Sequence, residues 1–144
     1  MILVVGGAFQ GKKEYAMRQF GIPEEAFADL ADFGAVDSDC VTEDDCSSET
    51  EALRDARAAD HLHRWIRSRM EAGDSPEKVW SALERFLADY PDIILLIDEI
   101  GCGVIPMDPF ERDWRECCGR IGCRLAEQAD EVHRVICGIG QRIR

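Results

Sequence analysis

The chain begins with a continuous apolar run, Met1–Val5, which leads directly into a glycine-rich segment, Gly6–Gly11. Isoleucine and valine are β-branched, and a short unbroken apolar run is typical of a strand that is buried on both faces. Residues 11–20 predict a helix, which ends at Gly21, a residue type that commonly terminates helices. A buried strand, a glycine loop and a helix in this order favour an α/β fold.

Further strands and helices follow the same scheme in the second half of the chain. Apolar runs at 93–97 and 132–137 predict two more buried strands, and residues 109–128 predict a long helix. The segment 74–77 supplies an N-cap and a first-turn proline for a helix that continues to about Asp89. Strands that are apolar throughout and separated by helices imply a parallel sheet with helices on both faces. We therefore expect a single three-layer α/β domain over residues 1–144.

Most of the acidity of the chain lies in a divergent segment between residues 21 and 60. This segment holds 13 Asp or Glu and 2 Arg, while the whole chain has a formal net charge of −12. We expect a short helix from Pro23 through Leu30, a short strand at Gly34–Val36, and a helix over Ser48–Ala72 from its apolar spacing of three and four residues. The acidic run is interpreted as a solvated face or, alternatively, as an arm that binds a metal or a partner.

The charge and the cysteines exclude several classes of function. A net charge of −12 disfavours nucleic acid and anionic membranes as partners, because both are bound by clustered Lys and Arg. No apolar run approaches the roughly 20 residues of a membrane span, and no signal-peptide pattern is found, so we expect a cytoplasmic protein. The seven cysteines form no CxxC pair, which argues against a disulfide framework and a four-thiolate zinc site.

The loop after the first predicted strand fits the pattern GxxxxGK, from Gly6 to Lys12. In this context, backbone amides and a helix N-terminus would surround phosphate oxygens, and Lys12 would contact the β- and γ-phosphates of a nucleotide. The next position holds Lys13, where a Ser or Thr hydroxyl would ligate Mg²⁺. The alternative is a glycine turn that only closes a strand–helix corner. The predicted nucleotide-binding residues are Gly6, Gly7, Ala8, Phe9, Gln10, Gly11, Lys12 and Lys13.

A pair of carboxylates, Asp98 and Glu99, directly follows the apolar run 93–97. In parallel sheets ligands bind outside the carboxyl ends of the strands, so this pair is expected at the same edge as the glycine loop. Lys12, Asp98 and Glu99 are the candidate catalytic residues, and Glu99 is the candidate Mg²⁺ ligand. Alternatively, the two carboxylates cap a strand end. Weaker candidates are Asp37 and Asp39, and Arg115 and Arg120, which would either clamp phosphate or pair on a solvated helix face.

Three segments resemble a known family. Residues 1–12 resemble the start of adenosylcobinamide kinase / adenosylcobinamide-phosphate guanylyltransferase, and residues 98–106, DEIGCGVIP, resemble the NEVG-x-GIVP segment of that family. A third likeness is to the family's run FRD-x-x-GR-x-NQ-x-LA-x-x-ADEV-x-x-V-x-G. It is carried by Arg115, Gly119-Arg120, Leu125-Ala126, Ala129–Val132 and Gly138. Together the likeness covers roughly residues 1–20 and 92–140.

The resemblance implies a P-loop NTPase-like parallel sheet and a role in cobalamin biosynthesis. It implies that ATP or GTP, with Mg²⁺, phosphorylates the aminopropanol hydroxyl of adenosylcobinamide. The family then transfers GMP from GTP through a covalent histidine intermediate, and its members form trimers. The expected partners are therefore cobinamide, a nucleoside triphosphate and further copies of the chain.

The chain departs from the family where the histidine motif I-x-x-H-H/K-x-x-R would stand. Residues 21–60 contain no histidine, and His61 and His63 do not match the motif, so we expect a helix-surface or packing role for both. His133 is expected to be a wall or surface residue of the last strand. The predicted function is therefore the kinase step, and the missing histidine motif leaves the guanylyl-transfer step open. The alternatives are a nucleotide-binding regulatory or assembly module with reduced chemistry, and a P-loop kinase for another small hydroxylated substrate.

Overall fold

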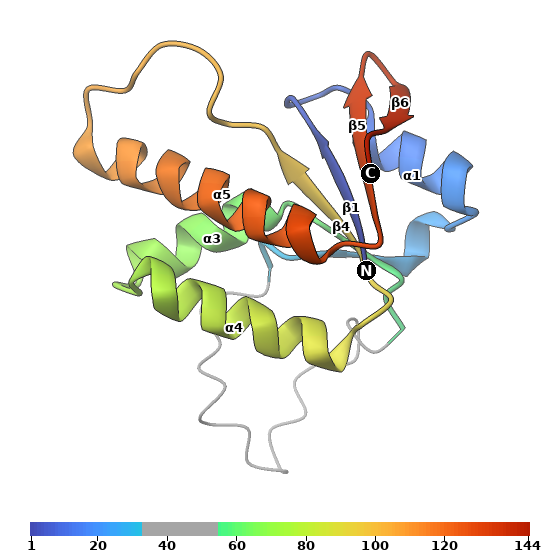
Figure 1. Ribbon diagram of the computed structural model, residues 1–144, viewed down its shortest axis with the longest axis horizontal. Helices are drawn as coiled ribbons and strands as arrows, with labels where there is room; N and C mark the ends of the chain where they lie inside the picture. The colour runs from blue at the N-terminus through green and yellow to red at the C-terminus, as the bar shows by residue number, and fades with distance from the viewer. Residues whose placement is uncertain (33–54) are drawn as a thin grey trace.

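A computed structural model describes residues 1–32 and 55–144 of the protein, and within them a six-stranded sheet forms the centre (Figure 1). The strand order is β2-β3-β4-β1-β5-β6. Neighbouring strands from β2 to β5 run parallel, and β6 is antiparallel to β5. The strands are β1 (Ile2–Gly6), β2 (Phe27–Asp29), β3 (Ala58–Asp60), β4 (Ile94–Asp98), β5 (Glu131–Ile136) and β6 (Ile139–Arg142).

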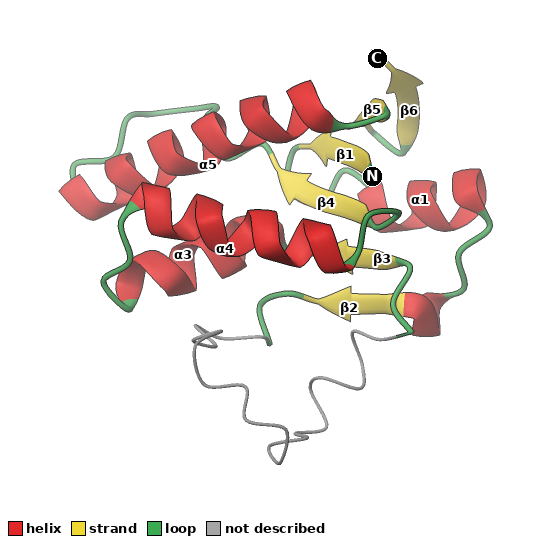
Figure 2. Ribbon diagram, turned by 60° about the horizontal axis from the view of Figure 1, so that its bottom comes forward, coloured by secondary structure: helices red, strands yellow, loops and turns green. Residues whose placement is uncertain are grey.

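Helices cover both faces of the sheet, which confirms the predicted three-layer α/β architecture (Figures 1 and 2). Helix α1 (Lys12–Phe20) lies on one face, and α3 (Leu62–Glu71), α4 (Pro76–Asp89) and α5 (Pro109–Gln128) lie on the other. Alternate residues of β1 serve the two layers: Leu3 packs with the three-helix side and Val4 packs with α1. Among the described residues, no helix combines the length and apolarity needed to cross a membrane.

The helix boundaries follow the signals in the sequence. Gly21 ends α1 with a left-handed backbone, φ 62°. Ser75 caps α4, because its hydroxyl oxygen accepts a hydrogen bond from the Lys78 amide at 3.4 Å. Asp108 caps α5 in the same way, accepting from the Glu111 amide at 3.3 Å. The expected helices at 11–20, 76–89 and 109–128 are thereby confirmed.

The expectations for the acidic segment were wrong where the structure describes it. The residues after Pro23 form a single 3₁₀ turn, Glu24–Ala26, and then strand β2, where we expected a helix through Leu30. Within the expected helix Ser48–Ala72, residues 58–60 form strand β3, and the helix starts only at Leu62. Both strands are held by pairing with distant parts of the chain, which overrides a local helical pattern. The expected strand Gly34–Val36, and Asp37 and Asp39, lie outside the described residues.

After β5 the chain forms a hairpin that the sequence did not predict, and its second strand, β6, is the edge strand of the sheet. Cys137 and Gly138 form its two-residue turn, and both have left-handed backbones, with φ of 51° and 76°. Positive φ at both positions is the geometry of a type I′ turn, which matches the twist of antiparallel strands. Cysteine is an unusual residue at such a turn, so the sequence carried little signal for β6.

Candidate functional site

The glycine loop lies between β1 and α1, at the carboxyl edge of the sheet, as its sequence predicts. A side chain on Gly6 would collide with the carbonyl oxygen of Val135 on the neighbouring strand, so that position accepts only glycine. Gly11 has a left-handed backbone, φ 78°, directly before the first helical residue. Phe9 also has a positive φ, 57°, and its side chain is fully exposed at the loop. The loop backbone is therefore held in a specific, bent conformation.

The turn of the β5–β6 hairpin supports this loop from the side. The side-chain oxygen of Gln10 accepts a hydrogen bond from the Cys137 amide at 2.6 Å. The backbone carbonyl oxygen of Gln10 accepts one from the Gly138 amide at 2.8 Å. Arg18 of α1 donates to the Gly138 carbonyl at 3.1 Å. The hairpin that the sequence did not reveal is thus a structural support of the candidate phosphate loop.

Lys12 is the residue that joins the two strand ends. Its ammonium group donates to the Gly7 carbonyl at 2.9 Å and forms an ion pair with Oδ1 of Asp98 at the end of β4. Lys12 is buried and Asp98 is nearly so. Because little water reaches this pair, its attraction is screened less than that of a surface pair. The structure therefore brings together two of the three predicted catalytic residues.

Within the described residues, Glu99, the third predicted catalytic residue, follows Asp98 directly but forms no ion pair with Lys12. Its amide donates to the Gly6 carbonyl at 2.8 Å, which ties the end of β4 to the start of the glycine loop. Its carboxylate pairs with Arg134 of β5 at 3.2 Å and remains partly exposed. Glu99 therefore faces the side of the edge that solvent reaches.

Lys13 points away from the loop, although it follows Lys12 directly. Its ammonium group lies 3.0 Å from the carboxylate of Glu24 and 5.4 Å from the ring centroid of Phe27. Both partners belong to the segment that leads into and forms β2. At the position where a hydroxyl would ligate Mg²⁺, this chain therefore directs a cation toward an exposed acid.

The sequence reasoning missed His63, which the structure places against Asp98. The Asp98 amide donates to Nδ1 of His63 at 3.4 Å, and Nε2 lies 3.6 Å from the Asp98 carboxylate. Because Nδ1 accepts, Nε2 carries the proton and faces the acid. Burial lowers the pKa of His63, and the Asp98 carboxylate opposes this only in part, so the ring is neutral at pH 7. His63 thus holds the backbone amide of Asp98, the residue whose carboxylate Lys12 contacts.

His61 lies beside His63, with ring centroids 5.9 Å apart, and its Nδ1 is 2.8 Å from the carboxylate of Asp29 at the end of β2. It has a left-handed backbone, φ 59°, between β3 and α3. Had the helix begun near residue 48, both histidines would have lain in its interior. The signal that could have placed them is the pair of alanines at 58 and 59 followed by Asp60, a short apolar strand that ends in an acid.

His133 has the wall role that was expected. It is buried in β5, its Nδ1 lies 2.8 Å from the Tyr15 hydroxyl, and its Nε2 lies 2.8 Å from Glu131. Phe20 packs edge-on against its ring, with centroids 5.2 Å apart. Burial raises the pKa of Tyr15, so the phenol stays protonated and donates to the ring. The group anchors α1 to the sheet behind the glycine loop.

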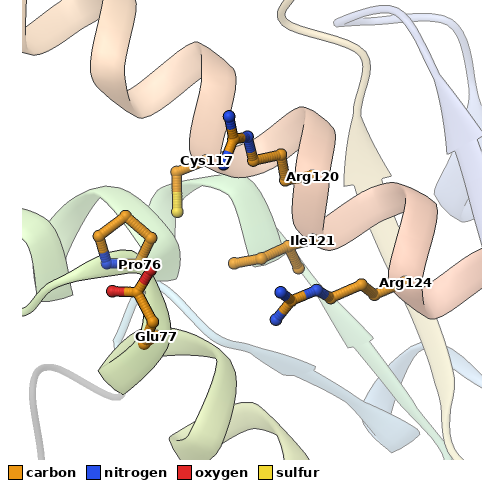
Figure 3. Close-up of a pocket in the computed structure, with 6 residues that line it drawn as sticks. All are labelled: Pro76, Glu77, Cys117, Arg120, Ile121 and Arg124. Atoms are coloured by element: carbon orange, nitrogen blue, oxygen red, sulfur yellow. The ribbon is translucent and has the colours of Figure 1, made fainter.

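The two candidate arginines of α5 do not converge on the glycine loop. Arg115 donates to the Val104 carbonyl at 2.9 Å and so holds the segment between β4 and α5. Arg120 pairs with Glu116 one helical turn earlier, at 2.5 Å. Figure 3 shows Arg120 with Arg124 at a small pocket between α5 and the start of α4, which also contains Glu77. Its volume of about 30 Å³ suits a water molecule rather than a nucleotide.

The described residues contain no cluster of three or more His, Cys, Asp or Glu that could hold a metal by itself. Mg²⁺ in kinase-type sites is commonly held by one or two carboxylates together with substrate phosphates, and it keeps several waters. Asp98 and Glu99 provide two neighbouring carboxylates beside the loop, and Lys12 already neutralises Asp98. Carboxylates of this kind fit Mg²⁺ delivered with a nucleotide, and each is paired with a cation in this structure, Asp98 with Lys12 and Glu99 with Arg134.

The fold and this edge define a P-loop-like α/β protein whose glycine loop faces a strand-end carboxylate. The family model described as "Cobinamide kinase / cobinamide phosphate guanyltransferase" matches residues 33–143. The chain belongs to this family, as the resemblance in its sequence predicts.

Two curated relatives agree with this assignment, and both are named "Bifunctional adenosylcobalamin biosynthesis protein CobU". The protein of Salmonella typhimurium is 31% identical over 119 residues, which cover 81% of this chain and 62% of the relative. The protein of Escherichia coli is 36% identical over 52 residues, which cover 36% of this chain and 29% of the relative. The chain thus spans less than two thirds of either relative.

Proposed function

We propose that the protein is a nucleotide-dependent kinase that phosphorylates the aminopropanol hydroxyl of adenosylcobinamide in cobalamin biosynthesis. The observation that carries the proposal is the contact of Lys12, at the start of α1, with Asp98, at the end of the adjacent strand. This contact places the candidate phosphate loop and the candidate general base, Asp98, together at one edge of the sheet. Membership in a family whose description names a kinase and a guanyltransferase supports the same reaction class.

In this proposal the glycine loop holds the phosphates of ATP or GTP. The amides of Gly6–Lys13 and the N-terminus of α1 would face the phosphate oxygens. Lys12 would turn part of its hydrogen bonding from Asp98 and the Gly7 carbonyl to the β- and γ-phosphates. Mg²⁺ bound with the nucleotide would neutralise phosphate charge, and Glu99 would hold it from the protein side.

The carboxylate of Asp98 would receive the proton of the acceptor hydroxyl. In the reaction, the hydroxyl oxygen bonds to the γ-phosphorus as the bond from that phosphorus to the β–γ bridging oxygen breaks. Asp98 suits this role because it is an acid at a strand end, within hydrogen-bonding reach of the loop. His63 would act through Asp98 by fixing its orientation.

Guanylyl transfer lies outside the proposal. The family's histidine motif has no counterpart among the three histidines of the sequence, His61, His63 and His133. His63 is buried against Asp98, and His133 is enclosed by Tyr15 and Glu131. We place the reaction in the cytoplasm, with cobinamide and a nucleoside triphosphate as partners, without nucleic acid or membrane, and with the chain assembled as a trimer like the family it resembles.

Incubation of the purified protein with Mg²⁺, cobinamide and either ATP or GTP tests the proposal. Mass spectrometry should detect phosphocobinamide from the wild-type protein, and none above background from Lys12→Ala. No GDP-cobinamide is expected, even with excess GTP. Tight nucleotide binding without phosphocobinamide from either nucleotide would overturn the kinase assignment.

A second candidate, a nucleotide-binding module without turnover, is favoured by one observation. Lys13 stands where the Mg²⁺-ligating hydroxyl would be, and its side chain is paired with Glu24. Phosphate binding by the loop does not depend on that hydroxyl, whereas phosphoryl transfer relies on the metal. The same incubation separates the candidates, since a module of this kind binds nucleotide and forms no product.

A further inference from the structure

The sheet and α5 border a second hollow, which is partly open to solvent and lies beside the glycine loop, with a volume of about 400 Å³. From the sheet it is lined by Leu3, Val5 and Ile97, and from α5 by Gly119, Gly122 and Ala126. Most of its lining is apolar. A volume in this range and an apolar lining with few polar groups are typical of sites for small organic ligands.

Two glycines of α5 line this cavity. Gly119 and Gly122 lie in the interior of α5, where glycine is less favourable than alanine. A Cβ atom added to either would meet no atom within 4 Å, and neither has a positive φ. No close contact or unusual backbone therefore requires glycine at these two positions, in contrast to Gly6. A larger side chain at either position would therefore find open space at the lining of the cavity.

Two residues that line the cavity, Asp98 and Glu99, also contact the glycine loop or its lysine. Asp98 lines the cavity and also forms the ion pair with Lys12. On β1, Leu3 and Val5 belong to the cavity side of the sheet, whereas Val4 packs toward α1. A molecule in the cavity therefore approaches Asp98 from the face of the sheet opposite α1.

The lining distinguishes between possible occupants. A nucleobase presents ring nitrogens and carbonyl or amino groups around its rim, and each needs a hydrogen-bonding partner when it is buried. The charged side chains of the cavity are Asp98, Glu99 and Arg115, and Arg115 already donates to the Val104 carbonyl. An apolar group that carries a hydroxyl fits this set better, because its one polar group can meet Asp98.

We propose that this cavity is the acceptor subsite: it holds the apolar flank of the hydroxyl-bearing substrate and directs the hydroxyl to Asp98. The inference rests on the proposed kinase function, and it adds the location and chemical class of the acceptor. The nucleotide occupies the glycine loop, the acceptor occupies the α5 side, and Asp98 lies between them.

Filling the cavity tests the proposal. Gly119→Leu and Gly122→Leu each add a leucine side chain at the lining of the hollow, and Asp113→Leu adds the same side chain at an exposed position of the same helix, outside the residues that line the cavity. Isothermal titration with cobinamide should give a Kd at least tenfold higher for the two glycine variants and within twofold of wild type for Asp113→Leu. The Kd of a fluorescent nucleotide should stay within twofold for all three.

Unchanged cobinamide binding in both glycine variants would overturn the subsite. So would a loss of nucleotide binding in place of cobinamide binding, because the cavity would then hold the base. Circular dichroism checks that each variant keeps its helical signal.

A second probe separates this inference from the proposed function. If wild-type protein binds no cobinamide, the kinase proposal fails, and 2-phenylethanol, an apolar alcohol, is titrated while amide NMR shifts are recorded. Saturable shifts at Gly119 and Gly122 that disappear in Gly122→Leu support an apolar-alcohol site. The absence of such shifts in the wild-type protein contradicts it.

Discussion

Lys12 and Lys13 are adjacent in sequence, yet they belong to two regions of different character. Lys12 is 7% exposed and pairs with Asp98, which is 15% exposed, between two central strands. Lys13 is 35% exposed and pairs with Glu24, which is 73% exposed, near the edge strand β2. Exposed pairs contribute about 0–1 kcal/mol, whereas breaking a buried pair typically costs about 3–5 kcal/mol. The comparison teaches that burial, not residue type, decides which lysine the site depends on.

The largest expected effect comes from removing the acid of the buried pair. Asp98→Ala leaves the Lys12 ammonium without its counter-charge and removes the proposed base. We expect the free energy of unfolding to fall by about 3 kcal/mol in urea titrations, and kcat for phosphocobinamide formation to fall by at least about 100-fold. Glu24→Ala is the matched control, with a loss of stability under about 1 kcal/mol. Equal effects of the two variants would contradict the distinction between the regions.

The next largest effect is expected at the strand end that leads into the glycine loop. Gly6→Ala places a Cβ against the Val135 carbonyl, and overpacking of this kind typically costs about 1–3 kcal/mol. Nucleotide binding should weaken as well, because the loop must shift. Gly119→Ala, which meets no atom, should instead raise the unfolding free energy by a few tenths to about 1 kcal/mol. Thermal unfolding of the two variants measures both changes in stability, the loss expected for Gly6→Ala and the gain expected for Gly119→Ala.

His63 should make the region of the buried pair sensitive to pH. Its pKa is lowered by burial, so the folded protein holds this proton more weakly than the unfolded chain, and stability falls as pH drops below the unfolded value of about 6.5. The Asp98 carboxylate raises the pKa of this ring, whereas His61, Arg64 and Lys12 add to the lowering by burial. Urea titrations at pH 7.5 and 5.5 in EDTA should show a smaller pH-dependent loss for His63→Gln than for wild type. An identical loss of stability in both proteins would contradict a role for His63 in the pH dependence.

The smallest expected effect concerns the exposed pair. Lys13→Ser breaks the contact with Glu24 and restores a hydroxyl at the position that ligates Mg²⁺ in related loops. Stability should change by less than about 1 kcal/mol. If the lysine limits metal binding, the Mg²⁺ concentration that gives half-maximal activity should fall severalfold. A loss of nucleotide binding in this variant would show that Lys13, too, serves the phosphates.

Sequence reasoning predicted the central strands and the helices that follow them, because β1, β4 and β5 are apolar runs and the helices carry capping residues. It missed β2, β3 and β6, which have three or four residues each and depend on pairing with neighbours that are distant in the chain or on an unusual turn. The missed strand β3 also led to the wrong position for His63. A helix that starts at residue 48 would place this histidine in its interior, whereas the observed helix starts at Leu62 and places His63 in its first turn, against Asp98. The position of the candidate site could thus be predicted from the ends of the strands, whereas His63 and the β5–β6 hairpin, which support it, could not.

The most direct test of the central claim is nucleotide affinity in Lys12→Ala and Lys13→Ala, measured by titration with a fluorescent, non-hydrolysable triphosphate at low and moderate salt. The account predicts at least a tenfold higher Kd for Lys12→Ala and a change within twofold for Lys13→Ala, with circular dichroism confirming that both variants are folded. A Lys12→Ala protein that binds the nucleotide as tightly as wild type would contradict the assignment of Gly6–Lys12 as a phosphate loop.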